Sequence, residues 1–173
     1  VFTSDNGPWL VKGKNGGSAL PLFEGKMTFF DGGLRVPAIM RWPGKIPSGK
    51  VCNELASTID LLPTIANITG ARIKTSYAID GKDIWDLMTD KKNVVSPHKY
   101  FFYRDKAVRW GDWKYHKQQV YKVKATKRAN KGEALYHLGE DIGEAKNVID
   151  KYPKITTQLR KALEAHNLTL TKQ

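Results

Sequence analysis

The sequence predicts an α/β fold: strands, a long loop and a helix in the first part, followed by a small antiparallel four-stranded sheet with one helix packed on it. Three observations predict it. Strand-like segments, a long polar loop and an amphipathic helix fill the first half, whereas the second half carries four short strand segments separated by turn residues. The last apolar residues then return to helical spacing. The pattern changes near Ser96-Pro97, so we expect domains over residues 1–95 and 96–173.

Composition excludes several classes of protein. The chain has 173 residues, of which 40% are hydrophobic, and this is typical of a globular protein rather than a disordered one. No apolar run approaches the roughly 18 residues that a membrane-spanning helix needs. The single cysteine, Cys52, excludes an internal disulfide and a zinc site built from cysteines, and we expect it to be an ordinary, partly buried residue.

Two strands and a long loop are expected in the first part. Residues 1–4 are β-branched and aromatic, which indicates the end of a buried strand, and the turn sequence Asp-Asn-Gly-Pro follows at 5–8. Residues 9–35 are rich in glycine and lysine and predict a long loop, and loops of this length in compact domains tend to be functional. A second strand is expected at 36–42, where Pro43-Gly44 ends it.

A helix and a short helical segment follow. Helical spacing of apolar residues begins at Ile59 and ends at Gly70, and Pro63 falls in the first turn, where its missing N–H is harmless. We attribute Asp60, at the start of this helix, to a favourable interaction with the helix dipole. Residues 84–88 predict one further helical turn.

The second part predicts a meander closed by a helix. The strands are expected at 100–103, 107–110, 113–116 and 134–138. Arg104-Asp105-Lys106 and Gly111-Asp112 are turn sequences between them, so neighbouring strands are expected to pair antiparallel. Residues 152–165 have the spacing of a helix that covers one face of this sheet.

The positive charge is concentrated in one region. The chain has 29 Lys and Arg against 17 Asp and Glu, a formal charge of +12, and residues 91–130 alone contain 12 basic and 2 acidic residues. Bases mixed with aromatic rings are typical of single-stranded nucleic-acid binding. Strand alternation favours another interpretation, with the rings on a buried face and the bases in solvent. We therefore expect no nucleic acid as partner and leave open a surface that binds a polyanion.

Three residues of the first part have chemistry of interest. Asp5 and Asn6 place a carboxylate and an amide oxygen side by side at a strand end, and such hard oxygen ligands suit Ca²⁺ or Mg²⁺. Lys26 lies in a glycine-containing loop, where its ammonium group can meet an anion. On local sequence alone, an ordinary turn and a solvated surface lysine are the favoured interpretations of these residues.

Seven sequence blocks, in the same order and with similar spacing, resemble those of the formylglycine-dependent sulfatases of the arylsulfatase type. The blocks begin at Val1, Asp31, Arg41, Ile59, Asp80, Val108 and Leu135, and they read VFTSDNGP, DGGLRVPA, RWPG, IDLLPT, DGKD, VRWGDWK and LYHL, the last followed by DIGE. The resemblance extends over nearly the whole chain. It implies an alkaline-phosphatase-like α/β fold, in which residues 1–95 end the large mixed-sheet domain.

The resemblance also implies functional roles. Asp5 and Asn6 match two ligands of a catalytic divalent cation, usually calcium, and Lys26 matches the lysine that contacts the sulfate. The family nucleophile, a formylglycine made within a Cys-x-Pro-x-Arg type motif, is expected upstream, because Cys52 lacks the Pro and Arg of that motif. The chain starts with Val1 in a strand-like segment, so we expect a C-terminal portion of a longer enzyme that is inactive by itself.

The same resemblance implies a sulfate ester as substrate, with sulfated carbohydrate among the candidates, and an exported protein. Two alternatives stay open at this point. One is a phosphoesterase or phosphonate hydrolase of the same superfamily, because phosphoryl and sulfuryl groups have similar shapes. The other is a binding module in which residues 91–130 hold a sulfated glycan. The four histidines, at 98, 116, 137 and 166, lack the spacing of a metal site and are expected to be structural or on the surface.

Overall fold

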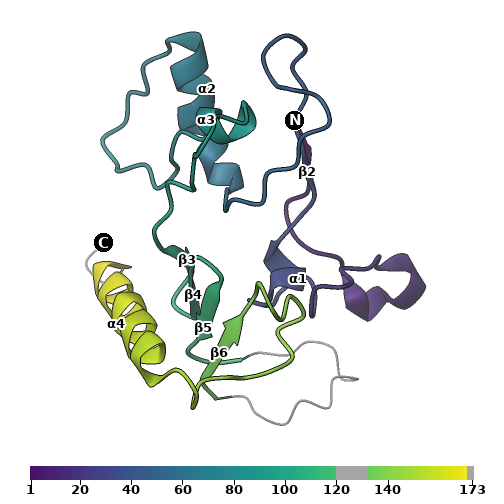
Figure 1. The fold of residues 1–173 in the computed structure, drawn as a ribbon, viewed down its shortest axis with the longest axis vertical. Coiled ribbons are helices and arrows are strands. Elements are labelled where there is room, and N and C mark those ends of the chain that lie inside the picture. Colours follow the sequence, from purple (N-terminus) through teal and green to yellow (C-terminus); the bar gives the residue numbers. More distant parts are fainter. Residues whose placement is uncertain (120–131, 171–173) are drawn as a thin grey trace. The chain divides into compact units, whose positions relative to one another are not determined.

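The computed structural model describes residues 1–119 and 132–170, which divide into two compact units (Figure 1). The helical unit comprises residues 1–2 and 39–99, and the sheet unit comprises residues 3–38 together with the chain from Tyr100 onward. The change of unit near residue 99 lies close to the predicted boundary at 95/96. Residues 3–38, however, group with the C-terminal sheet. The assignment of residues 1–95 to a larger domain concerns the whole protein and stays a prediction.

The helical unit contains the predicted helix in two parts, a 3₁₀ turn η2 (Thr58–Asp60) and α2 (Leu61–Thr69), and the short α3 (Trp85–Met88). Gly70 ends α2 in the left-handed conformation, with φ of 68°, which a residue without Cβ adopts at little cost. Pro63 occupies the first turn of α2 as expected. The start and the end of this helix are therefore both encoded by local sequence.

Asp60 does more than interact with the helix dipole. Its carboxylate is fully buried and accepts hydrogen bonds from the backbone N–H of Ser57 at 2.7 Å and of Lys82 at 2.8 Å. The Nε2 atom of His98 lies 2.9 Å from both carboxylate oxygens. Asp60 thus joins three segments of the helical unit, and His98 is structural, which is one of the two roles expected for the histidines.

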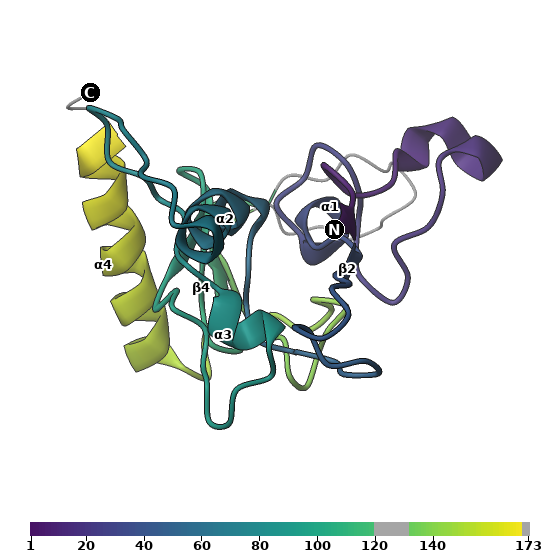
Figure 2. The ribbon, with the colours of Figure 1, turned by 90° about the horizontal axis from the view of Figure 1, so that it is seen from above.

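The sheet unit contains the predicted antiparallel meander. Its strands pair in the order β3 (Phe101–Tyr103), β4 (Ala107–Trp110), β5 (Trp113–His116) and β6 (Ala134–His137). The helix α4 (Pro153–Leu170) packs along the sheet, and Figure 2 shows it beside β4. The core between them is formed by Val108, Tyr115, Leu135, Leu159 and Leu163. The predicted order of strands and the packed helix are therefore confirmed.

The opposite face of the sheet is covered by the segment that was expected to be a long loop. Within residues 9–35 the chain forms η1 (Leu10–Asn15) and the one-turn helix α1 (Asp31–Leu34). Phe30 is fully buried there, with Ala134, Tyr136 and Leu138 of the sheet side. The sheet consequently lies between α4 and this N-terminal segment, which explains why residues 3–38 belong to the sheet unit.

Four expectations are corrected by the structure. Residues 1–4 were expected to end a buried strand, but the strand there has two residues and Phe2 is 66% exposed. The second strand was expected at 36–42, but only β2 (Ala38–Ile39) forms, paired with β1 (Phe2–Thr3). Cys52 is exposed rather than partly buried. The bases of the sheet were expected in solvent, yet Lys114 is fully buried, because both faces of the sheet are covered and a carboxylate is available on the second face.

No helix in residues 1–119 and 132–170 is long and apolar enough to cross a membrane. Part of the basic region, including Lys122, Lys124, Lys127 and Arg128, lies outside the residues that the structure describes.

Candidate functional site

The predicted metal ligands lie directly after β1. Asp5 is exposed and Asn6 is half-buried, and the Ser4 hydroxyl donates a hydrogen bond to the Asn6 carbonyl at 3.0 Å. The next residue, Gly7, donates its N–H to the Gly33 carbonyl at 2.9 Å. A Cβ at Gly7 would lie 1.8 Å from the Gly32 carbonyl oxygen, so this close approach requires glycine. The turn that carries Asp5 and Asn6 is therefore attached to α1.

The loop of Lys26 is attached to the same turn. The backbone N–H of Lys26 donates to the Pro8 carbonyl at 2.9 Å, and a Cβ at Gly25 would lie 2.4 Å from that carbonyl oxygen. On either side of Gly25-Lys26, Glu24 and Met27 have positive φ of 62° and 75°, conformations that L-residues rarely adopt. Strained backbone of this kind clusters at functional sites. The structure thus joins the two segments that carry the three predicted site residues.

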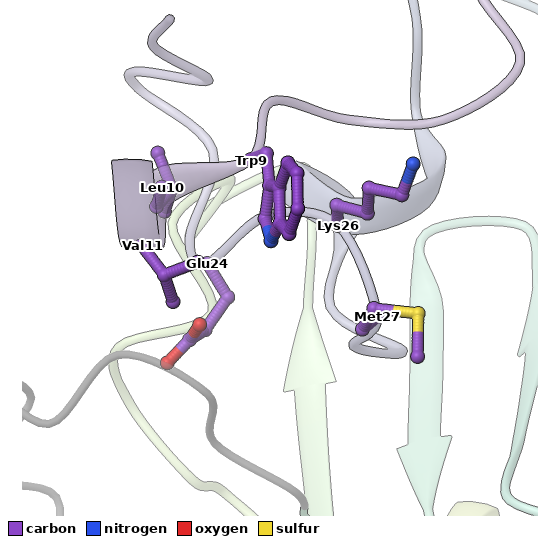
Figure 3. Close-up of a pocket in the computed structure, with 7 residues that line it drawn as sticks. Trp9, Leu10, Val11, Glu24, Lys26 and Met27 are labelled. Carbon is purple, nitrogen blue, oxygen red and sulfur yellow. The ribbon is translucent and has the colours of Figure 1, made fainter. Parts of the chain in front are cut away.

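Figure 3 shows the pocket beside Lys26. It has a volume of about 130 Å³, and its lining includes Trp9, Leu10, Glu24 and Met27 together with Lys26. The Trp9 side chain was not among the predicted site residues. The Lys26 ammonium lies 5.8 Å from the centroid of its ring, within the range of a cation–π contact.

A buried charge cluster anchors α1 to the sheet. The Lys114 ammonium donates to Oδ1 of Asp31 at 2.6 Å and lies 3.0 Å from Oε1 of Glu144. The other oxygen of Glu144 accepts the backbone N–H of Asp31 at 2.7 Å, and Nε2 of His116 lies 3.0 Å from Oε1. All four side chains are buried. Because burying charges without partners is costly, this arrangement fixes the position of α1 on the sheet.

The cluster determines the protonation of its members. Burial by itself would lower the pKa of Lys114, but the neighbouring Glu144 and Asp31 carboxylates outweigh it and hold that pKa above its usual value. Burial would raise the pKa of Glu144, and Lys114 and His116 more than compensate, so the pKa is lowered. Burial, together with the charge of Lys114, lowers the pKa of His116 despite its contact with Glu144. Near neutral pH, therefore, Lys114 is cationic, Glu144 is anionic and His116 is neutral.

Tyr103 completes the surroundings of Lys114. The ammonium lies 4.7 Å from the centroid of the Tyr103 ring, and burial raises the pKa of this phenol to about 12, with the charge of Lys114 acting in the opposite direction. Arg109 lies at the edge of the cluster, 4.0 Å from Oδ2 of Asp31. The cationic groups consequently balance the two carboxylates.

Sequence reasoning placed Lys114 in solvent and assigned no contacts to Glu144 or Asp31. Asp31 and Glu144 are 113 residues apart, and nothing in a single sequence indicates that they meet. The register of the sheet in the structure shows which face Lys114 and His116 lie on. Lys114 lies opposite Tyr136, and His116 lies opposite Ala134, on the face that Phe30 covers.

The oxygen donors of Asp5 and Asn6 fit one side of a calcium site, because calcium takes carboxylate and amide oxygens. Within residues 1–119 and 132–170, no group of three or more His, Cys, Asp or Glu side chains could hold a metal ion. Calcium takes about 6–8 oxygen ligands, so such a site would need further ligands besides Asp5 and Asn6, and their metal role stays a prediction.

Comparisons with known proteins identify the family. The family model of the C-terminal part of N-sulphoglucosamine sulphohydrolase matches residues 21–169. N-acetylgalactosamine-6-sulfatase of Sus scrofa is 42% identical over 119 residues, which cover 66% of this chain and 22% of that protein. Arylsulfatase A of Homo sapiens is 34% identical over 183 residues, which cover 95% of this chain and 36% of that protein. The chain thus spans about a fifth to a third of these relatives.

Solved structures agree with the sequence relatives. The PsFucS1 sulfatase from Pseudoalteromonas sp. superposes with a TM-score of 0.83 at 26% identity, covering 99% of this chain and 37% of that one. Ps i-CgsB, solved in complex with k-i-k-neocarrahexaose, gives a TM-score of 0.76 at 27% identity, covering 96% and 35%. The expected sulfatase fold class is confirmed. The chain therefore belongs to the N-sulphoglucosamine sulphohydrolase C-terminal family and is a C-terminal portion of a sulfatase.

Proposed function

We propose that the complete protein hydrolyses sulfate esters, with Lys26 contacting the sulfate and Asp5 and Asn6 binding a divalent cation, calcium in the first instance. The observation that carries this proposal is the hydrogen bond from Lys26 N–H to Pro8 carbonyl, which holds the lysine loop against the turn of the two oxygen ligands. Family membership supports it independently. The nucleophile, a formylglycine, would be supplied by a segment outside this chain.

The proposed roles follow from the charge of the reacting group. As an S–O bond to the leaving group breaks, negative charge develops on the leaving oxygen, and the sulfuryl oxygens remain anionic. An ammonium such as that of Lys26 is a mobile point charge that binds these oxygens without needing a fixed geometry. A cation held by Asp5 and Asn6 would act as a Lewis acid on the same group.

The substrate class is part of the proposal. Relatives are named for N-acetylgalactosamine 6-sulfate, and a neighbouring structure was solved with a neocarrahexaose, so sulfated carbohydrates are the first substrates to test. The proposal also includes export of the whole protein, which would be tested by fractionating cells that produce it from its own gene.

The test is an assay of the full-length protein on 4-nitrophenyl sulfate, 4-nitrophenyl phosphate and N-acetylgalactosamine 6-sulfate. Lys26→Ala and Asp5→Ala are each expected to lower kcat/KM for sulfate esters by roughly 100-fold or more, since each removes stabilisation of the transition state. Lys14→Ala, which removes an exposed lysine of η1, is the matched control and should retain wild-type rates. Turnover of the phosphate alone would instead indicate a phosphoesterase of the superfamily.

Binding of a polyanion by residues 91–130 stays a prediction. The burial of Lys114 removes one of the bases from the surface on which that prediction depended.

A further inference from the structure

We propose that Trp9 forms a subsite for the sugar ring of a sulfated saccharide whose sulfate is bound by Lys26. This inference rests on the proposed function, and it adds the group that would bind the organic part of the substrate. An exposed tryptophan alone would carry no such conclusion, because single exposed apolar residues are common on protein surfaces. The position of Trp9 in the pocket, the hydrogen bonds of its backbone and the charges beside its ring point to a subsite.

The first observation is the position of the ring. Trp9 lines the pocket that Lys26 also lines, and 49% of its surface is exposed. In Figure 3 the ring lies beside the Lys26 side chain, with Met27 near the lysine and Glu24 on the other side of the ring. A ligand bound to the ammonium would therefore have the indole as its neighbour.

The second observation is that the backbone of Trp9 is held in place. Its carbonyl accepts the N–H of Lys12 at 3.0 Å, and a Cβ at Gly16 would lie 2.1 Å from that carbonyl oxygen. The preceding residue, Pro8, accepts the N–H of Lys26. The residue before Trp9 is thus hydrogen-bonded to Lys26, which holds the backbones of Trp9 and Lys26 near each other. A backbone that is already ordered lowers the entropy cost of binding a ligand.

The third observation is the positive charge around the Trp9 ring, to which Lys26 contributes from the lining of the pocket and Lys12 from outside that lining. The ammonium groups of Lys12 and Lys26 lie 4.7 Å and 5.8 Å from the centroid of the Trp9 ring. An indole offers a rigid apolar face, and the two ammonium groups attract an anionic substituent. A sulfated pyranose has the complementary pattern, because its C–H groups form an apolar face and its sulfate and hydroxyl groups form a polar rim.

The size of the pocket sets the extent of the subsite. About 130 Å³ is below the roughly 300–1,000 Å³ of pockets that enclose a whole drug-sized ligand. We therefore assign it one sugar ring, the one that carries the sulfate, with any further saccharide outside it.

The experiment separates binding of the sugar from binding of the sulfate. With full-length protein and 4-nitrophenyl sulfate as reporter, inhibition constants are measured for inorganic sulfate, N-acetylgalactosamine 6-sulfate and N-sulphoglucosamine. The wild-type protein should bind at least one sulfated sugar more tightly than inorganic sulfate. Trp9→Ala should weaken binding of that sugar by roughly tenfold, because the stacked face is lost, and should change inhibition by inorganic sulfate less than about twofold.

Two further variants control for folding and for the aromatic ring. Trp9→Phe keeps a ring and should restore most of the sugar preference, whereas Tyr77→Ala removes an exposed ring of the helical unit and should change neither constant. An unchanged ratio of the two constants in Trp9→Ala, or no sugar preference in the wild-type protein, would overturn the subsite alone. Absence of any sulfatase turnover by the wild-type protein would overturn the proposed function and the subsite with it.

Discussion

Lys114 is the residue that connects the sheet with the loop of the candidate site. It lies in β5, whereas Asp31, which accepts its hydrogen bond, begins α1. Gly33, two residues further along α1, is bonded to the turn that follows Asp5 and Asn6. The C-terminal sheet thereby positions the proposed ligands through one buried charge.

Replacing Lys114 with methionine should destabilise the protein strongly. The change would leave Asp31 and Glu144 buried without their cation, and breaking a buried ion pair costs about 3–5 kcal/mol. Lys117→Met, at an exposed position after the same strand, is the matched control and should stay within about 0.5 kcal/mol. Urea unfolding of the full-length protein measures both. Equal stability of the two variants would show that the cluster does not contribute.

The same cluster should make the protein sensitive to acid. The pKa of His116 is lower in the folded state than in the unfolded chain, so the unfolded chain binds more protons. The free energy of unfolding is therefore highest above the unfolded pKa of about 6.5, and it decreases as the pH falls through the folded pKa. The pKa of Glu144 is also lowered by folding, so protonation of Glu144 at a lower pH further reduces the free energy of unfolding. Melting temperatures measured from pH 8 to 4 at constant ionic strength should therefore fall. His116→Gln should flatten the part of this curve near pH 6, and an unchanged slope would contradict the assignment.

At the scale of the element, α1 is a packing centre although it has only four residues. The backbone of Gly32 and Gly33 approaches the carbonyls of the lysine loop so closely that a Cβ on Gly33 would lie 2.6 Å from the Gly25 and Thr28 oxygens. The loop, the turn after β1 and α1 are therefore packed against one another through their backbones. Backbone contacts of this kind explain how a segment with little regular secondary structure can hold a site.

Gly7→Ala tests this packing. Its Cβ would collide with the Gly32 carbonyl, and relieving the collision should displace the turn of Asp5 and Asn6 at a cost of about 1–3 kcal/mol. We expect a lower melting temperature and lower kcat/KM for 4-nitrophenyl sulfate in the full-length protein. Gly143→Ala is the control, because a Cβ there would meet its nearest atom at 3.4 Å, an ordinary contact. Wild-type activity of both variants would refute a role for the close approach.

At the scale of the whole molecule, the chain presents the surface of an incomplete protein. In the helical unit, Phe2, Ile39, Leu62 and Ile65 are among the exposed large apolar residues. The chain also spans only 22% to 36% of its sequence relatives. We expect the remainder of the full-length protein to cover some of these residues.

The isolated chain should accordingly be inactive and bind calcium weakly. It offers the two proposed oxygen ligands Asp5 and Asn6, whereas calcium takes about 6–8 oxygen ligands. Isothermal titration of calcium into the isolated chain should show no tight stoichiometric binding. The full-length protein should bind calcium, and Asp5→Ala should weaken that binding. Tight binding by the fragment, retained in Asp5→Ala, would place the calcium elsewhere in this chain.

The sequence by itself determined the elements whose signals are local. The four strands of the meander, the helix at its end and the stop of α2 at Gly70 follow from turn residues, apolar spacing and capping, which act over a few residues. The resemblance of short blocks was sufficient for the family, which the comparisons confirm. The sequence also predicts roles for Asp5, Asn6 and Lys26, and these stay predictions.

Only the tertiary structure decided which face each residue meets. Alternation along β5 placed Lys114 in solvent, because a single sequence does not indicate that both faces of the sheet are covered. The pairing of Asp31 with residues 83 and 113 positions away, and the place of Trp9 beside Lys26, depend on contacts between distant segments. Burial and charge pairing are properties of such contacts, and the energy of a buried charge is set by partners that chain folding brings near.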